Sequence, residues 1–456
     1  MMVGERKAGE TLRLGVFMYG HCNYHVAGWR HPDSWTDAGS NVDRWIAFAR
    51  RMERAKLDML FIADGVGVSG ADNPDRLSRT GVGDAFEPLT LLGALSAVTE
   101  RLGLVATCAT TYTQPYNVAR MFASLDQLAH GRSGWNLVTG GNPDEARNFN
   151  MDSFVPATER YAQAEEFADV VLGLWDSFDE GAFIRDKARG LYLRPEAIHT
   201  LGHKGSYYKV AGPLGVARSP QGRPVLIQAG KSDSGKNLAS RVADLIFTAA
   251  ATLEEAQAFY ADVRARAEAF GRAPGDLKVL PGISVYLGAT EAEARRNFEE
   301  LEALMPIDVA VERLSRILGG VDLSGFELDK PMPPLEANQA RMGTPVAYTK
   351  LAQAGNLTLR QVALRSATSK DHLIAIGTVD QVVDTMERWF KEAGADGFNL
   401  LPHTVPGALD DFIDQVVPEL RRRGLFRTEY EGTTLRENLG LPVPASRYAK
   451  KPVPVA

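Results

Sequence analysis

The stretch GLVATCATTYTQPYNVARMFASLDQLAHGRSGWNLVTG (103–140) decides the fold. Its composition predicts a strand at 103–110, a helix at 115–129 and a strand at 133–140. Outward from this unit the alternation continues, with strands predicted at 12–19, 58–64, 224–230, 244–250, 277–288 and 396–402. Eight strands alternating with helices predict an α/β protein, and eight is the number that closes a (β/α)₈ TIM barrel. A doubly wound open sheet stays as the alternative, because one sequence does not reveal strand order.

We predict that the whole chain, 1–456, is one barrel domain with insertions. Three stretches interrupt the alternation, at about 65–86, 179–222 and 289–372. Beyond about 425 we expect a C-terminal arm, which from about 436 lacks apolar periodicity and is predicted to be extended or frayed. The first and third insertions are candidate lids over the predicted site.

Composition narrows the function classes. Apolar residues make up 45% of the chain, while 51 Lys and Arg stand against 57 Asp and Glu, for a net charge of −6. This balance argues against a nucleic-acid partner. The uncharged run 102–119 contains threonines and Pro115, which exclude a membrane span. Cys22 and Cys108 make no disulfide framework, so a cytoplasmic protein is expected.

A metal site is not expected either. His21, Cys22, His25 and His31 cluster after the first predicted strand. Their spacing matches no zinc pattern, and no carboxylate is interleaved. Of these residues, His21 and His25 are candidates to bind or protonate a reacting oxygen at the mouth of the barrel.

The ends of the predicted strands are polar. Barrel enzymes carry their chemistry on the loops after the strands. The residues delivered there include Asp64, Thr107, Thr110, Thr111, Asn136, Thr139, Ala229, Gly230 and Ser232. A buried polar group needs a partner, and a polar ligand supplies one, although strand-end capping explains any single residue.

Of all the segments, QAGKSDSGKNLASR (228–241) has the pattern that points most directly to ligand binding. A strand ends, and Gly230 and Ser232 then open a helix whose free N–H groups suit a phosphate, with Lys231 or Lys236 as added charge. An ordinary serine N-cap is the alternative. GVGVSG (65–70) matches the dinucleotide fingerprint, but no amphipathic helix or acidic strand end follows. We interpret it as a loop over the pocket.

Several segments in order resemble a known family. They are HVAGWRHP (25–32), FIAD (61–64), FEPLTLLGALSAVTERLGL (86–104), the stretch 107–140, EARNFN (145–150), ERYAQAEEF (159–167), GPLGVARSPQGRPVLIQAG (212–230) and FRTEYEGTTLRENLGLP (426–442). The chain resembles the oxygenase component of two-component flavin monooxygenases of the bacterial-luciferase superfamily. Within it, the nitrilotriacetate monooxygenase, dibenzothiophene-sulfone monooxygenase and pristinamycin synthase group is most similar. Gly140, Asn150 and Lys231 depart from the group's usual residues.

The resemblance implies a (β/α)₈ barrel that uses reduced FMN, with O₂ as co-substrate and a separate NAD(P)H:flavin reductase as partner. By matching positions, Asp64, Thr107 and Asn136 would line the isoalloxazine and ribityl chain. Tyr161, Gly230 and Ser232 would hold the phosphate, and His25 would face the reacting side. A homodimer or homotetramer is implied, with the C-terminal arm reaching a neighbour.

The reaction class is less narrowly defined. C–N cleavage, C–S cleavage and hydroxylation of a small organic substrate all stay open. A deazaflavin- or NAD-dependent dehydrogenase on the same barrel, or a non-catalytic flavin-binding barrel, is the alternative.

Overall fold

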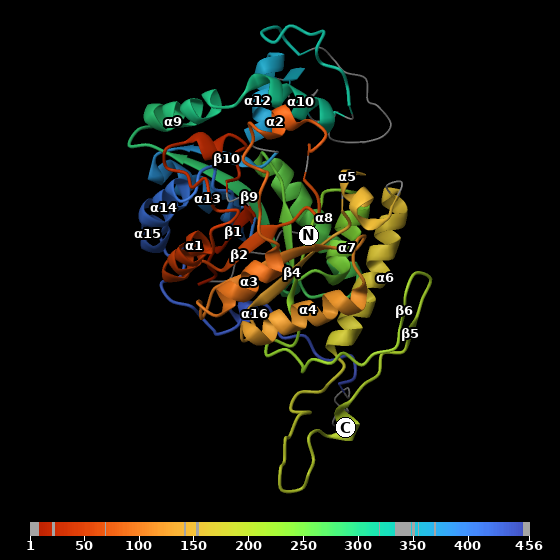
Figure 1. Ribbon diagram of the computed structural model, residues 1–456. Coiled ribbons are helices and arrows are strands. Elements are labelled where there is room, and N and C mark those ends of the chain that lie inside the picture. Colours follow the sequence, from red (N-terminus) through yellow and green to blue (C-terminus); the bar gives the residue numbers. More distant parts are fainter. Residues whose placement is uncertain are drawn as a thin grey trace.

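Eight parallel strands close into a barrel (Figure 1). The computed structural model describes residues 9–20, 23–68, 70–140, 143–151, 155–318, 320–332, 348, 352–353, 355–368 and 371–449. The barrel strands are β1 (Arg13–Tyr19), β2 (Met59–Ala63), β3 (Gly103–Ala109), β4 (Ser133–Val138), β7 (Val225–Ala229), β8 (Leu245–Thr248), β9 (Lys278–Leu287) and β11 (Gly397–Leu400). They pair in this order, and β11 returns to β1. The closed ring confirms the barrel and excludes the open sheet.

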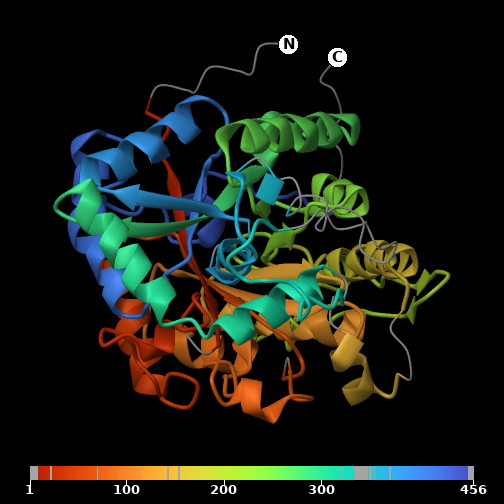
Figure 2. The same ribbon diagram turned by 90° about the horizontal axis from the view of Figure 1, so that it is seen from above.

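Helices cover the outside of the ring, as Figure 2 shows from above. They are α1 (Val42–Arg54), α3 (Pro88–Ser96), α4 (Pro115–Leu128), α6 (Ala157–Trp175), α7 (Asp233–Val242), α8 (Leu253–Ala269), α13 (Val379–Lys391), α14 (Gly407–Asp411) and α15 (Val417–Arg422). None of the helices in the described ranges combines the length and the apolar character that crossing a bilayer requires.

The interior of the barrel is filled by aromatic side chains. The ring of Phe17 lies 5.0 Å from that of Phe61 and 4.7 Å from that of Phe247, measured between centroids. These rings come from β1, β2 and β8, so the strands are buried on both faces and read as continuous apolar runs. The packed interior leaves the carboxyl ends of the strands as the place for a site.

The segment after residue 425 corrects one expectation. Its first part is not extended: it forms α16 (Leu435–Asn438) beneath the barrel, and Leu435, Leu439 and Leu441 join the interior cluster. Residues 442–449, in contrast, form no helix or strand and are exposed or half-buried. Arg436 is 1% exposed and binds both carboxylate oxygens of Asp244, at 3.0 and 2.8 Å. This buried pair holds the segment against its own barrel. Residues 450–456 of the expected arm lie outside the described residues.

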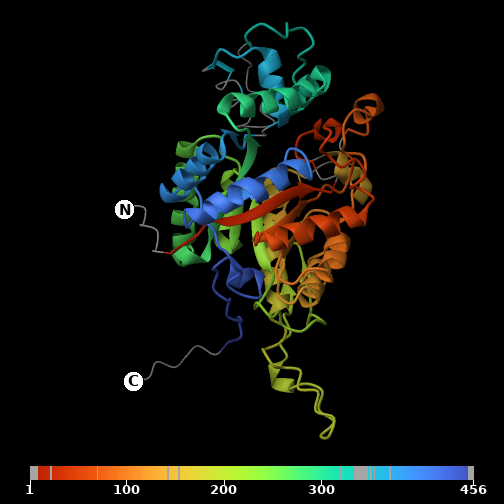
Figure 3. The same ribbon diagram turned by 90° about the vertical axis from the view of Figure 1, so that its left-hand side faces the viewer.

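The predicted insertions contain short elements of their own. Segment 65–86 contains α2 (Pro74–Leu77), and 179–222 contains the hairpin β5 (His203–Lys204) and β6 (Lys209–Val210). Figure 3 shows that part of the second segment projects away from the barrel. Segment 289–372 forms α9 (Glu291–Ala303), α10 (Ile307–Ile317) and α12 (Leu359–Thr368), which lie above the carboxyl ends of the strands (Figure 1).

A ninth strand was not predicted. β10 (Leu373–Gly377) pairs in parallel with the second half of β9, from Ile283 to Leu287. Because β9 is 10 residues long, it extends beyond the barrel and offers a free edge there. β10 therefore anchors the end of the third insertion to the main sheet.

The buried pair beneath the barrel carries a prediction. Burial by itself raises the pKa of Asp244, but the Arg436 and Arg223 guanidiniums hold it well below its usual range. Asp244→Asn would leave Arg436 charged and buried without an anion, so a loss of about 3–5 kcal/mol in the free energy of unfolding is expected. Urea denaturation measures it.

The matched control is Asp169→Asn. Asp169 pairs with Arg241 at 2.7 Å, but its side chain is 52% exposed. Its loss is expected to stay below about 1 kcal/mol. Equal, small losses in both variants would contradict the role assigned to the buried pair.

Candidate active site

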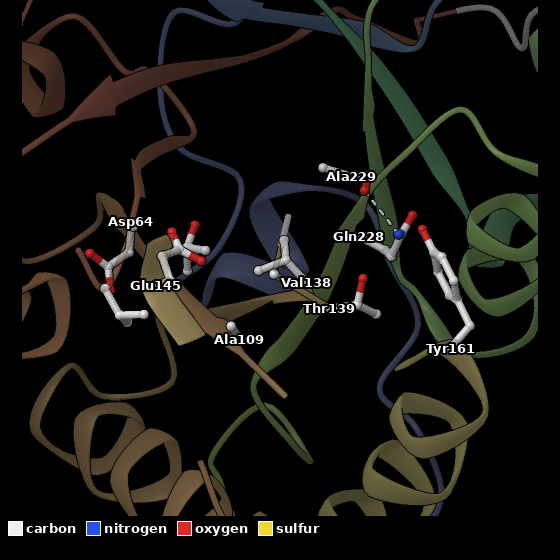
Figure 4. A pocket seen from close by; sticks show the side chains of 12 residues that line it. Asp64, Ala109, Val138, Thr139, Glu145, Tyr161, Gln228 and Ala229 are labelled. Atoms are coloured by element: carbon white, nitrogen blue, oxygen red, sulfur yellow. Dashed lines mark hydrogen bonds between the residues drawn. The ribbon is translucent and has the colours of Figure 1, made fainter. Parts of the chain in front are cut away.

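A polar cavity of about 270 Å³ opens at the carboxyl ends of β2, β3, β4 and β7. Among its lining residues are the predicted Asp64, Thr107 and Tyr161, together with Glu145 and Gln228, which we did not predict (Figure 4). The strand-end rule thus found the right end of the barrel, and it brought residues from four strands to one place.

The strands β3 and β4 place two predicted residues side by side. Thr107 and Asn136 are register partners, and Asn136 Nδ2 donates to Thr107 Oγ1 at 2.9 Å. Both side chains are buried. Asn136 Oδ1 is buried and accepts no hydrogen bond from the described residues. Because an unpaired buried acceptor is costly, this oxygen suits a ligand that donates a hydrogen bond.

Gln228 offers a second open acceptor. It lies on β7, is 2% exposed, and its Nε2 donates to the carbonyl oxygen of Ala229 at 2.9 Å. Its Oε1 is buried without a partner in the described part of the chain. The signal in the sequence is a glutamine at the end of an apolar strand, at the first position of the segment 228–241, to which the sequence analysis gives no role of its own. A Cβ at the neighbouring Gly230 would lie 3.2 Å from Gln228 Nε2, so glycine keeps this approach open.

The start of α7 adjoins the cavity through Tyr161, which lines it, whereas the predicted Asn136, Gly230 and Ser232 do not line the cavity themselves. Ser232 is the N-cap, and its Oγ accepts from the backbone N–H of Gly235 at 3.1 Å. Tyr161 reaches the same point from α6, with its hydroxyl 3.2 Å from Ser232 Oγ. The positive end of the 10-residue α7 faces this position, which favours an anion.

The predicted lysines contribute differently from the expectation. Lys236 Nζ lies 2.5 Å from Asp262 and 3.4 Å from Asp233, so its charge is already matched. Lys231 is exposed. Attraction for an anion at this end therefore comes chiefly from the backbone of α7 and from the two hydroxyl groups.

Carboxyl groups lie at another part of the cavity wall. Asp64 follows β2, and Glu145 lies on α5 (Pro143–Ala146) and is buried. Solvent reaches one side of Asp64, yet burial by the walls and then the charge of Glu87 raise its pKa to about 6. The cavity therefore has acidic groups in one part of its wall, and an anion-favouring helix start lies beside another part, at Tyr161.

His25 does not line this cavity. It lies on the loop after β1 and is buried. Its Nδ1 accepts from the N–H of Ala27 at 3.1 Å, so the neutral ring carries its proton on Nε2, which lies 3.5 Å from Thr368 Oγ1 on α12. His25 thus contacts the third insertion. The other candidate, His21, lies outside the described residues, as does Cys22. No group of three metal-ligating side chains occurs in the part of the chain that the structure describes.

Comparison with known proteins settles the family. Residues 23–397 match the family model described as luciferase-like monooxygenase. The chain belongs to the luciferase-like monooxygenase family. The family that the sequence motifs resemble is thereby confirmed.

Two relatives and one solved structure extend the match over nearly the whole chain. An N-acetyl-S-(2-succino)cysteine monooxygenase of Bacillus subtilis is 46% identical, covering 97% of this chain and 99% of the relative. Nitrilotriacetate monooxygenase component A of Aminobacter aminovorans is 44% identical with the same coverage. A crystal structure of riboflavin lyase with modified FMN and riboflavin is 33% identical, with a TM-score of 0.83, covering 94% of this chain and 96% of the lyase.

These matches establish the enzyme class. The protein is a flavin-dependent monooxygenase that uses O₂ and depends on a separate reductase, as the component naming of a close relative implies. The dehydrogenase and the non-catalytic flavin-binding barrel are thereby set aside.

The raised pKa of Asp64 gives a prediction with a definite sign. In the folded chain the Asp64 carboxyl group keeps its proton up to about pH 6, whereas its ordinary pKa is 3.8. Ionisation of Asp64 therefore disfavours the fold as the pH rises between these values. Asp64→Asn is expected to match the parent protein below about pH 4 and to become the more stable of the two above about pH 6. Urea denaturation across this range measures the difference, and a constant difference would contradict the assignment.

Proposed function

We propose that the cavity binds reduced FMN, and that the enzyme inserts one oxygen atom of O₂ into a small organic substrate. The observation that carries this proposal is a pair of buried acceptors at the cavity wall. Gln228 Oε1 belongs to a lining residue, and Asn136 Oδ1 belongs to the hydrogen-bonded partner of the lining residue Thr107. The capped start of α7 adjoins the same cavity through Tyr161. Open acceptors suit a ring and chain that donate hydrogen bonds, and a helix start suits a phosphate. A structural relative that carries modified FMN supports the same ligand.

Each predicted residue has a part in holding the cofactor. Asp64, Thr107 and Asn136 are proposed to contact the isoalloxazine and ribityl chain, and Gln228 joins them on β7. Tyr161, Gly230 and Ser232 are proposed to hold the phosphate. The flavin, when bound, supplies the reaction with O₂. The protein orients it and keeps water out of the mouth of the barrel.

His25 is proposed to hold a proton on the reacting side. Its Nε2–H tautomer, fixed by Ala27, and its contact with Thr368 beneath the insertion support this role. Burial keeps the ring in one orientation, which a proton donor needs.

The substrate and the partners follow from the same comparison. Two relatives are named for N-acetyl-S-(2-succino)cysteine and nitrilotriacetate, so carboxylated thioethers and amines are the first substrates to test. We propose that an NAD(P)H:flavin reductase delivers the reduced flavin in the cytoplasm. A homodimer or homotetramer is proposed for the assembly.

The phosphate end can be tested without knowing the substrate. Ser232→Ala removes the hydroxyl that we place on the phosphate, so reduced FMN is expected to bind about 5- to 30-fold more weakly. Reduced riboflavin, which has no phosphate, is expected to bind the variant as it binds the parent protein. Ser234→Ala is the control, because Ser234 is exposed on the same turn. An equal loss for both flavins would contradict the placement of the phosphate.

The cofactor and the reaction are tested by an anaerobic titration with reduced FMN, followed by mixing with isotopically labelled O₂ and a panel of carboxylated substrates. Tight binding and one labelled oxygen atom in the product are expected. Absence of binding, or label found only in water and hydrogen peroxide with every substrate, would overturn the proposal.

A further inference from the structure

Two of the predicted insertions meet in a row of ion pairs. The strap, defined here as residues 70–80 and containing α2, lies beside α10 above the carboxyl ends of the strands (Figure 1). Asp72 pairs with Arg316 at 3.2 Å, Arg76 with Glu312 at 3.3 Å, and Arg79 with Asp308 at 2.5 Å.

The three pairs form an ordered ladder. The paired residues of the strap run acid, base, base, and their partners on α10, read in reverse, run base, acid, acid; Asp75 and Arg313 carry further charges outside the three pairs. The members on α10 are four residues apart, so they occupy one face of the helix. The central guanidinium, Arg76, is 11% exposed, and the outer members are more open to solvent. Complementary charge at every rung fixes the register in which strap and helix meet.

The strap is connected to the cavity at one end and flanked by glycines at both ends. Gly65 and Val66, just before it, line the cavity. Gly70 has φ +83, a conformation that strains other residues, and a Cβ there would meet the guanidinium of Arg76. Gly81 and Gly83 follow the strap, and a Cβ on Gly83 would meet nothing within 4 Å. Glycines at both ends allow the strap to swing.

We propose that the strap and α10 form a gate over the barrel mouth, and that the ladder of three ion pairs holds this gate closed over the bound flavin. The proposal rests on the proposed function, because it assumes that flavin occupies the cavity. Opening breaks the three pairs and moves the cavity wall at Gly65 and Val66. Closing excludes water from the reaction.

The outermost rung suits a charge-swap cycle, because Arg79 and Asp308 form no other ion pair in the described part of the chain. The variants are Arg79→Asp, Asp308→Arg and the double swap. Release of reduced FMN is followed anaerobically with a trap protein in excess. Thermolysin cleavage before Leu77 in the strap reports opening without any flavin.

Each single variant places like charges together, so release and cleavage are expected to be about two- to fivefold faster than in the parent protein. The double swap restores opposite charges and is expected to return both rates to within about twofold. Raising NaCl from about 0.05 to about 0.5 M is expected to speed both processes in the parent protein. The control is Arg360→Asp, which breaks an exposed pair with Asp329 in the same insertion and is expected to change neither rate, because neither residue pairs with the described residues of the strap.

Four results would overturn the proposal, and the last of them would also overturn the proposed function. In the first, the double swap speeds release and cleavage by as much as the two single variants combined, which would show that this ion pair does not hold the gate. In the second, the rate of thermolysin cleavage is the same in all variants and at both NaCl concentrations, which would show that the strap does not open by breaking these pairs. In the third, the single variants speed cleavage and the double swap restores it, but the rate of FMN release stays constant; the contact then exists and does not gate the flavin. Failure of the parent protein to bind reduced FMN would overturn the proposed function, and the gating of flavin with it, whereas the cleavage cycle still decides whether the contact forms.

Discussion

The barrel depends on buried carboxylates that hold the beginnings of neighbouring strands together. Asp58, before β2, accepts from the N–H of Leu14 at 2.6 Å, and Asp244, before β8, accepts from the N–H of Leu226 at 2.8 Å. Asp396, before β11, does the same for Val279 at 2.8 Å. Each carboxylate also contacts an arginine, respectively Arg427, Arg436 and Arg264. These ion pairs are buried or partly buried, so removing one partner is far more costly than at the surface.

This arrangement separates stability from chemistry. The amino-terminal ends of the strands are closed by matched charges and by the leucines around α16. The carboxyl ends carry polar groups whose hydrogen-bonding capacity is not used up, such as Asn136 Oδ1 and Gln228 Oε1. A ligand placed at that end satisfies groups that the fold leaves open, and the pairs at the opposite end are not disturbed. The gate follows the same division, because its ion pairs are more exposed and therefore easier to break.

Much of the architecture was predictable from local pattern. All eight barrel strands were expected within a few residues of their observed bounds, because strands buried on both faces are continuous apolar runs. Asp64 and Thr107 line one cavity because the carboxyl ends of parallel strands lie at one edge, and Tyr161 joins them from α6, beside the start of α7. The roles of these residues, and that of His25, stay predictions. Gln228 escaped notice because a single glutamine in an apolar strand has no periodic signal.

The sequence by itself determined the alternation of strands and helices, the end of the barrel that carries the site, and the family. Only the tertiary structure decided ring closure, the burial of α16 and the meeting of the strap with α10. Arg436 and Asp244 are 192 residues apart in the chain, and no local pattern pairs them. Local periodicity records which face of an element is apolar, whereas the partner of a charged side chain is set by the packing of distant segments.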